Sequence, residues 1–246
     1  MSETDETIDR IASYREQLEQ APGTWPAKRT LADSIRQLMD CLCATDAPEE
    51  ELLAIAAQVQ ESAERFQDQP RMTNLPGIAE GSLAGGMEMF MDRSPVVGRS
   101  NPLAPPVALD PDHEAKIVRG EVYFGRAYEG APGCVHGGYV AATFDEALGL
   151  ACVFSGVPGM TGEITIRYLK PTPLEVPLRL EARFDRQDGR KIYNSGELYA
   201  GDLRVAESSG IFISIQPEKF EALRQAQIDR QNSQAETRGR STKPKV

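Results

Sequence analysis

Apolar residues recur at helical spacing through the first 70 residues of the chain. Three stretches place them three and four positions apart, as one face of an α-helix requires. Thr30 and Asp33 resemble a capping box for the second helix, after an interruption at Pro26. Pro48, followed by acidic residues, is typical of a third helix start. These narrow stripes should pack on the rest of the chain or on a second subunit; they comprise Ile8, Ile11, Tyr14 and Leu18, then Leu31, Ile35, Leu38, Met39 and Leu42, then Leu52, Ile55, Ala56, Val59, Ala63 and Phe66.

Glycine and proline interrupt this pattern between residues 71 and 110. They break any regular element there, and only the Met-Glu-Met-Phe-Met run at 87–91 forms a short apolar patch. We therefore interpret residues 1–76 as a helical N-terminal extension and residues 77–113 as a Gly/Pro-rich connector. The interrupting residues are Gly81, Gly85, Gly86, Pro95, Pro102, Pro105 and Pro106.

From residue 114 the pattern changes to strand, helix and strands. A β-like stretch at 116–128 precedes a nearly all-apolar helix at 136–154, and apolar and polar residues then alternate through several segments. Asp-Gly at 188–189 predicts a hairpin turn, and Gly201 with Asp202 predicts another. The pattern indicates an α+β domain at 114–217, with an antiparallel sheet wrapped around the helix. Residues 218–246 are expected to add a short helix and a disordered, basic tail.

Composition and charge narrow the possible partners. A chain of 246 residues suffices for one sizeable core with an extension. The net charge is −10, and the first 75 residues hold fifteen acidic but only seven basic residues. This acidity argues against a nucleic-acid or anionic-membrane partner for that segment. No apolar run approaches the length that spans a bilayer.

The cysteines and the N-terminus predict a cytoplasmic location. Cys41, Cys43, Cys134 and Cys152 form neither a disulfide framework nor a metal-binding pattern, so we expect reduced thiols and no metal. The acidic first residues argue against a signal or transit peptide.

The chemistry concentrates in residues 134–149. Two glycines at the start of the apolar helix allow close approach of a ligand to free backbone N–H groups and the positive end of the helix dipole. Asp145 follows His136 by nine residues and lies within the helix, where an ionised side chain is costly. We expect Asp145 to be partly buried with a raised pKa. This combination outlines an acyl-transfer site. In the alternative, Asp145 is a capped or paired structural acid and the neighbouring Glu146 is the exposed surface residue.

Residues 115–216 resemble the hotdog-fold thioesterases. The resemblance rests on Tyr128-Glu-Gly-x-Pro-Gly-x-Val-His-Gly-Gly138, then Asp145, then Met160-Thr161, and then Ile166-x-Tyr-x-x-Pro-x-Pro173. The phenylacetate-pathway enzymes and the mitochondrial long-chain acyl-CoA thioesterases are the most similar types. The resemblance implies a hotdog fold and hydrolysis of an acyl-CoA thioester to free acid and CoA, with no cofactor.

The same resemblance implies roles for individual residues. Asp145 would be the general base that activates water, and Thr161 would help to hold that water. The backbone N–H of Gly138 would stabilise the oxyanion. His136 and Gly137 would shape the turn beside the substrate, although His136 could instead be a base. A structural role for Asp145 or Thr161 stays open, and no base is spaced to make Cys134 a nucleophile.

Phosphates of CoA require a basic surface near this site. Arg167, Lys170, Arg190 and Lys191 are the candidates, with ordinary cross-strand charge pairs as the alternative. The resemblance also implies a homodimer or a dimer of dimers, in which two sheets join edge to edge. The apolar run at 87–91 would be a core plug or part of an acyl-chain pocket, and we expect residues 1–110 to dock on the dimer.

Two other functions remain open from the sequence. A hotdog dehydratase or hydratase would use a catalytic histidine with a carboxylate, which the Asp145–Thr161 pair argues against. A non-catalytic acyl-CoA binding or regulatory protein would use the N-terminal helices as its interaction module. His113, in a Pro-Asp-His connector, is expected to be a solvated loop residue. Thioesters of CoA and of acyl-carrier protein both fit these residues.

Overall fold

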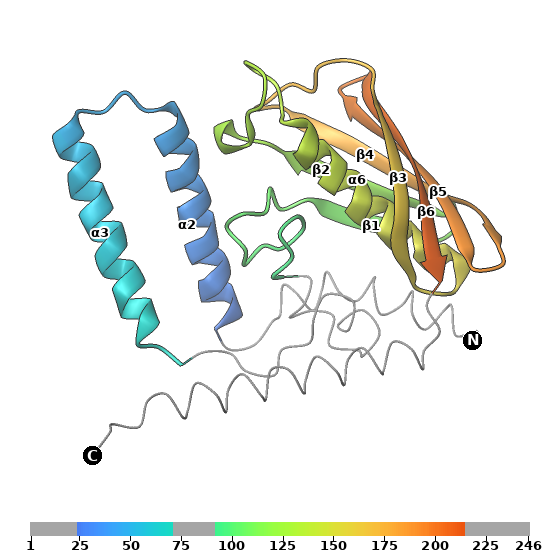
Figure 1. The fold of residues 1–246 in the computed structure, drawn as a ribbon, viewed down its shortest axis with the longest axis horizontal. Helices are drawn as coiled ribbons and strands as arrows, with labels where there is room; N and C mark the ends of the chain where they lie inside the picture. Colours follow the sequence, from blue (N-terminus) through green and yellow to red (C-terminus); the bar gives the residue numbers. More distant parts are fainter. Residues whose placement is uncertain (1–23, 71–91, 215–246) are drawn as a thin grey trace.

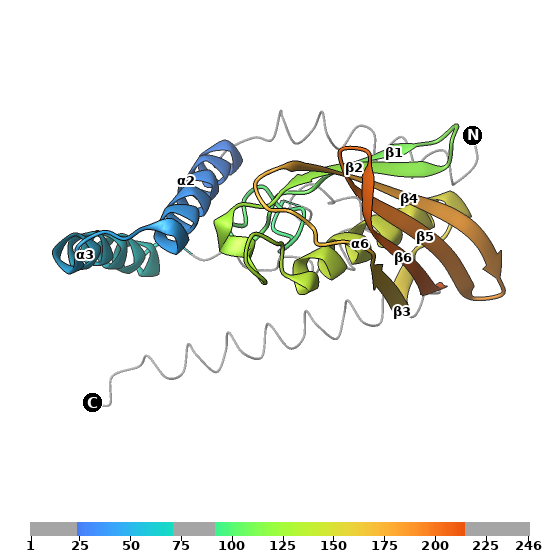
Figure 2. The same cartoon turned by 90° about the horizontal axis from the view of Figure 1, so that it is seen from above.

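The computed structural model describes residues 24–70 and 92–214. Within these residues, a six-stranded antiparallel sheet curves around helix α6, and helices α2 and α3 lie to one side (Figures 1 and 2). This is the α+β hotdog arrangement that the sequence predicted. The elements are α2 (Trp25–Ala44), α3 (Glu49–Gln67), β1 (Ala108–Asp112), β2 (Ile117–Tyr123), η1 (Arg126–Tyr128), α6 (Gly137–Ala151), η2 (Cys152–Ser155), β3 (Gly159–Tyr168), β4 (Pro177–Asp188), β5 (Lys191–Ala200) and β6 (Leu203–Ser214).

The strand order is β1-β2-β4-β5-β6-β3, so β1 and β3 are the edges of the sheet. Strands β4 and β5 form the predicted hairpin, and the turn contains Gly189 with a φ of 57°. Gly201, with a φ of 58°, makes the turn between β5 and β6 in the same way. Both positions need the left-handed backbone that glycine adopts without a Cβ clash, and both hairpins match the sequence prediction.

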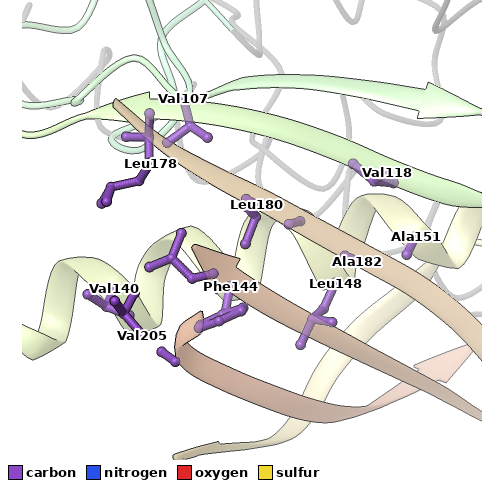
Figure 3. Close-up of a cluster of buried hydrophobic side chains, with 14 of the residues drawn as sticks. Val107, Val118, Val140, Phe144, Leu148, Ala151, Leu178, Leu180, Ala182 and Val205 are labelled. Carbon is purple, nitrogen blue, oxygen red and sulfur yellow. The ribbon is translucent and has the colours of Figure 1, made fainter. Parts of the chain in front are cut away.

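Helix α6 buries its apolar face in the concave side of the sheet. Phe144 and Leu148 are fully buried there, among the residues drawn in Figure 3. Two strand glycines make room for them, since a Cβ on Gly196 would meet both Phe144 and Leu148 at 3.3 Å, and one on Gly210 would meet Leu148 at 3.2 Å. The fit of α6 therefore depends on missing side chains in β5 and β6 as well as on its own apolar residues.

Strand β1 lies at the end of the segment that we expected to be an irregular connector. It pairs with β2, and Pro111 lies within it opposite Val118. Proline lacks an N–H, but an edge strand needs hydrogen bonds on one side only. The segment at 77–113 thus ends in a strand, and the edge position explains why Pro111 is tolerated in it.

Helix α2 begins earlier than the sequence suggested. It starts at Trp25, and Pro26 occupies its first turn, where a missing N–H costs nothing. The predicted capping box is wrong, because Thr30 lies inside the helix and its hydroxyl donates to the carbonyl of Pro26.

Polar contacts fasten α2 to the sheet domain. The Arg29 Nε donates to both Asp92 carboxylate oxygens at 3.1–3.2 Å, and both residues are buried. The Arg36 guanidinium donates to the Asn101 carbonyl at 2.8 Å, and the Ala127 N–H donates to Asp40 at 3.0 Å. Helix α2 thus contacts the sheet domain of its own chain, but Leu31, Leu38 and Leu42 of its apolar stripe are exposed. The packed face is the one that carries Arg29, Arg36 and Asp40.

Helix α3 lies on the far side of α2 from the sheet (Figures 1 and 2). None of its residues is buried, and Leu52, Leu53, Val59 and Phe66 are exposed. Its start after Pro48 agrees with the sequence prediction. The predicted helices at 8–18 and 218–232 and the apolar run at 87–91 lie outside the described residues. No helix within 24–70 or 92–214 is long and apolar enough to cross a membrane.

Replacing Leu148 with alanine should lower the free energy of unfolding by about 2–5 kcal/mol. The residue is 0% exposed and fills the space beside Gly196 and Gly210. Leu203→Ala is the control, because Leu203 is 53% exposed and its loss should change stability by less than about 0.5 kcal/mol. Urea unfolding followed by circular dichroism measures both. Equal effects of the two substitutions would contradict this packing.

Candidate functional site

The predicted base and the predicted hydroxyl residue meet between α6 and β3. The Thr161 hydroxyl donates a hydrogen bond of 2.7 Å to Oδ1 of Asp145, although sixteen residues separate them. Asp145 projects from the flank of α6 that faces the edge strand and is exposed in the single chain, not partly buried as expected. The pair therefore lies where solvent or a second molecule can reach it.

A β-bulge turns Thr161 toward the helix. Thr161 pairs with Phe212 and Glu163 pairs with Ile211, so Gly162 is an extra residue in β3. Ile164 lies opposite Gly210 on the helix side of the sheet, and simple alternation would place Thr161 on the other side. The bulge restores it to the helix side, which is the kind of re-aiming for which bulges are used near functional sites.

The start of α6 is held by side chains on both sides. His136 is the N-cap, and its Nδ1 accepts from the N–H of Gly138 at 3.0 Å. The Tyr168 hydroxyl, from β3, donates to the Gly137 carbonyl at 2.8 Å. The predicted oxyanion donor, the Gly138 N–H, thus already has an acceptor in this structure. Gly137, the first residue of α6, contributes an N–H that has no acceptor within the helix.

The helix start and Asp145 are separated along α6. Gly138 and Asp145 are seven positions apart in α6, which is about 10 Å at the rise of an α-helix. In a hydrolytic site, the water molecule held by the base lies close to the carbonyl group that the water attacks. The distance between them is much shorter than the separation of Gly138 and Asp145 along α6. One chain therefore does not bring the two parts of the predicted site to the same reacting atom.

Glu146, next to Asp145, is the less exposed of the two acids. Its carboxylate accepts a hydrogen bond of 2.9 Å from the hydroxyl of buried Ser94. Burial raises the pKa of Glu146, and the nearby charge of Asp145 adds to the rise, while the Ser94 bond opposes it. Glu146 is thus partly buried, whereas Asp145, which we expected to be partly buried, is exposed. The sequence did not point to Ser94, because its hydrogen-bond partner, Glu146, lies 52 residues further along the chain.

An open pocket of about 400 Å³ lies between α2 and the sheet domain. Met39 and Asp40 of α2, Pro106, and Tyr128 of η1 are among the residues that line it. The Tyr128 ring packs edge-on against Tyr139 in the first turn of α6, with 4.8 Å between the ring centroids. Tyr128, which lines the pocket, is therefore in direct contact with the first turn of α6.

The four basic candidates do not converge on the Asp145–Thr161 pair. Arg167 forms a cross-strand ion pair with Glu207 on the side of the sheet away from α6. The Arg190 guanidinium donates to the Ser214 carbonyl at the β4–β5 hairpin, with Lys191 beside it. Lys170 follows β3, and its N–H donates to the Val205 carbonyl. The register of β3, β6 and β5 places Lys191 at the Thr161 end of the sheet and Arg167 at the other end.

The other reactive side chains, those of Cys152, Cys134 and His113, make contacts that are typical of structural residues. Burial raises the pKa of the Cys152 thiol to about 12, and Cys134 donates weakly to the Pro132 carbonyl. His113 packs edge-on against Phe154, and both of its ring nitrogens are buried, so it is not the solvated loop residue expected. In the segments that the structure describes, no group of three or more His, Cys, Asp or Glu residues could hold a metal ion.

Sequence comparison places the site residues within a known family. The thioesterase superfamily model matches residues 132–207, which include the helix start, Asp145 and Thr161. The acyl-coenzyme A thioesterase THEM4 of Bos taurus is 34% identical over 93 residues, 37% of this chain and 38% of that protein. THEM5 of Homo sapiens is 30% identical over 97 residues, 39% of each chain. The chain thus spans about two-fifths of the length of these relatives.

Structural comparison extends the similarity to most of the chain. A solved thioesterase superfamily protein is 32% identical, with a TM-score of 0.67 over 76% of this chain and 90% of its own. The matched 76% of the chain is more than the sheet and α6 contain, so the similarity includes part of the sequence outside them. The identity and the coverage together show that the chain belongs to the thioesterase superfamily.

Proposed function

We propose that the chain is an acyl-CoA thioesterase that hydrolyses its substrate to a free acid and CoA. The hydrogen bond between Thr161 and Asp145 is the observation that carries this proposal, because it orients a carboxylate that faces open space. The names of THEM4 and THEM5, acyl-coenzyme A thioesterases, support the substrate class. Release of thiol from a panel of acyl-CoA esters, with enoyl-CoA hydration followed in parallel, tests the proposal.

Asp145 acts as the general base in this proposal. Water is a weak nucleophile at neutral pH, so the carboxylate takes a proton from it as its oxygen attacks the thioester carbon. Thr161 donates to Oδ1, which leaves the other carboxylate oxygen, Oδ2, for the water. The tetrahedral intermediate then expels the CoA thiolate, and the proton from water returns to the thiolate sulfur. A thiol of ordinary pKa, about 8.5, needs no strong acid in order to leave.

Backbone N–H groups at the start of α6 stabilise the oxyanion in this proposal. These groups carry the positive end of the helix dipole, and glycine at 137 and 138 permits close approach. Because His136 already accepts from the Gly138 N–H, the substrate oxygen would displace or share that contact. This N-cap position of His136 favours a turn-shaping role over its use as the base of a dehydratase.

A homodimer completes the site in this proposal. Strand β3 is an edge of the sheet, with Met160 and Tyr168 exposed along it. Open edges invite pairing with another strand. Joining two copies at β3 would bring the helix start of one subunit toward Asp145 of the other, which removes the separation of about 10 Å along α6 within one chain. It would also cover the exposed Asp145.

Asp145→Asn should lower the rate of acyl-CoA hydrolysis by roughly 10²-fold or more without unfolding the protein, because asparagine cannot accept the proton. Asp185→Asn is the matched control, since Asp185 accepts a 2.8 Å hydrogen bond from the Ser195 hydroxyl in a similar exposed pair on the sheet. Steady-state thiol release and thermal unfolding measure both variants. Near-normal turnover of Asp145→Asn would exclude Asp145 as the base.

Two inactive variants should restore activity to each other when mixed. Asp145→Asn subunits keep the helix start, and Gly138→Pro subunits keep the carboxylate but lose the N–H. Unfolding and refolding a mixture should yield about one-quarter of the wild-type activity, since half of the dimers are mixed and each holds one intact site. Each variant refolded alone is the control. No recovery, or a monomeric mass by light scattering in active enzyme, would contradict the shared site.

The pocket between α2 and the sheet is our candidate seat for the acyl group, because Tyr128, which lines it, contacts the first turn of α6. Met39→Trp fills this pocket and should reduce kcat/KM for the longest accepted acyl chains about tenfold more than for acetyl-CoA. Leu42→Trp, one turn further along α2 and 62% exposed, is the control. An unchanged chain-length profile for Met39→Trp would place the acyl group elsewhere.

A further inference from the structure

Glu146 and Asp145 leave α6 on opposite flanks of its outer side. Successive residues of an α-helix are rotated by about 100°, and the buried residues Phe144 and Ala147 on either side face the sheet. Asp145 therefore points toward β3 and bonds Thr161, while Glu146 points the other way and bonds Ser94. Two consecutive residues thus hold the middle of α6 from both sides.

Ser94 is a rigid partner for this bond. Its side chain is buried, and its hydroxyl oxygen also accepts from the N–H groups of Val96 and Val97, at 3.1 and 3.2 Å. The turn is closed further by the Gly98 N–H, which donates to the Ser94 carbonyl at 3.1 Å. At Gly98 a Cβ would lie only 2.4 Å from that carbonyl oxygen, so the turn has no room for a side chain. The Ser94 hydroxyl has one direction in which to point its proton, toward Glu146.

The same turn is fastened to the N-terminal extension. Asp92, two residues before Ser94, is buried, and it accepts from Arg29 of α2 and from the Ser100 hydroxyl. The Ser100 N–H also donates to the Asp92 carbonyl at 2.9 Å. Hydrogen bonds therefore fix Asp92 to α2 and Ser94 to Glu146, and the short backbone segment between Asp92 and Ser94 joins the two attachments.

Glu146 is a partly buried carboxyl next to a second carboxyl, and such a group is unfavourable at a position where a side chain only has to fill space. Burial and the charge of Asp145 both disfavour ionised Glu146, as the raised pKa of its carboxyl reflects. An apolar or amide side chain would avoid this cost at the same position. The geometry gives Glu146 a use that offsets it, because its bond to Ser94 opposes rotation of α6 on the side away from Thr161.

We propose that Ser94 and Glu146 are positioning residues for Asp145, holding the rotation of α6 so that the Asp145 carboxylate meets Thr161. This inference rests on the proposed thioesterase function for its catalytic consequence. It makes the turn at 92–100, and the α2 helix that anchors it, a working part of the site.

Ser94→Ala is the direct test. It removes the hydrogen bond to Glu146 and should lower kcat for acyl-CoA hydrolysis about tenfold, with KM changed by less than about twofold. The same substitution placed in Asp145→Asn should cause no further loss, because its effect passes through Asp145. Glu146→Ala should repeat the loss, and Glu146→Gln, which still offers an oxygen to Ser94, should keep kcat within about twofold of wild type.

Ser155→Ala is the control for a purely structural serine. Its hydroxyl donates to the Cys152 carbonyl at 2.7 Å just beyond the end of α6, so its loss should lower stability without changing kcat. Wild-type kcat in both Ser94→Ala and Glu146→Ala would overturn the inference. So would a Glu146→Gln variant as slow as Glu146→Ala, since the charge and not the hydrogen bond would then matter.

A crystal structure of Ser94→Ala separates this inference from the proposed function. The inference predicts that the distance between Thr161 Oγ and Asp145 Oδ1 increases beyond hydrogen-bonding range. An unchanged distance would overturn it, whatever the activity. If the wild-type protein hydrolyses no thioester while the variant still loses this hydrogen bond, the proposed function fails and the positioning role stands.

Discussion

Helix α6 is held in the curve of the sheet by a face of fully buried apolar residues, and this packing determines where its polar residues can lie. With Phe144 and Leu148 seated against Gly196 and Gly210, the helix turns Asp145 toward the edge strand and Glu146 toward the turn at 92–100, where the proposed role of the Ser94 bond is to hold this rotation. The bulge at Gly162 then supplies Thr161 on the correct side of β3. The proposed catalytic pair follows from helix packing and one extra strand residue.

Periodicity in the sequence was sufficient for the elements that pack by apolar contact. The α6 helix, the hairpin at Gly189 and the strands around it agree with the alternation of their residues, and the Asp145–Thr161 pair agrees with the family resemblance. Features set by long-range polar contacts were missed or inverted. The sequence could not show that Glu146, and not Asp145, would be the partly buried acid and bond Ser94. It also could not show that Pro111 would lie in an edge strand. Nor could it show that α2 would pack through Arg29 and Asp40 instead of its leucines.

The N-terminal extension is joined to the sheet domain by specific hydrogen bonds, and the similarity to a solved thioesterase superfamily protein covers more of the chain than the sheet and α6. Arg29, Arg36 and Asp40 each bond a different segment of that domain. This distribution favours a role in shaping the site over that of an independent module. Helix α3, whose residues are all unburied, has no comparable attachment in the described structure.

In the proposed mechanism, the Asp145 carboxylate activates a water molecule that attacks the acyl carbon, and does not attack that carbon itself. A single turnover in H₂¹⁸O, with enzyme in excess over acyl-CoA, tests this most directly. Direct attack by water should give a released acid that carries one ¹⁸O atom and a protein that carries none. Incorporation of ¹⁸O into the Asp145 carboxylate would show that it attacks as a nucleophile, and absence of any thiol release would exclude the proposed hydrolysis.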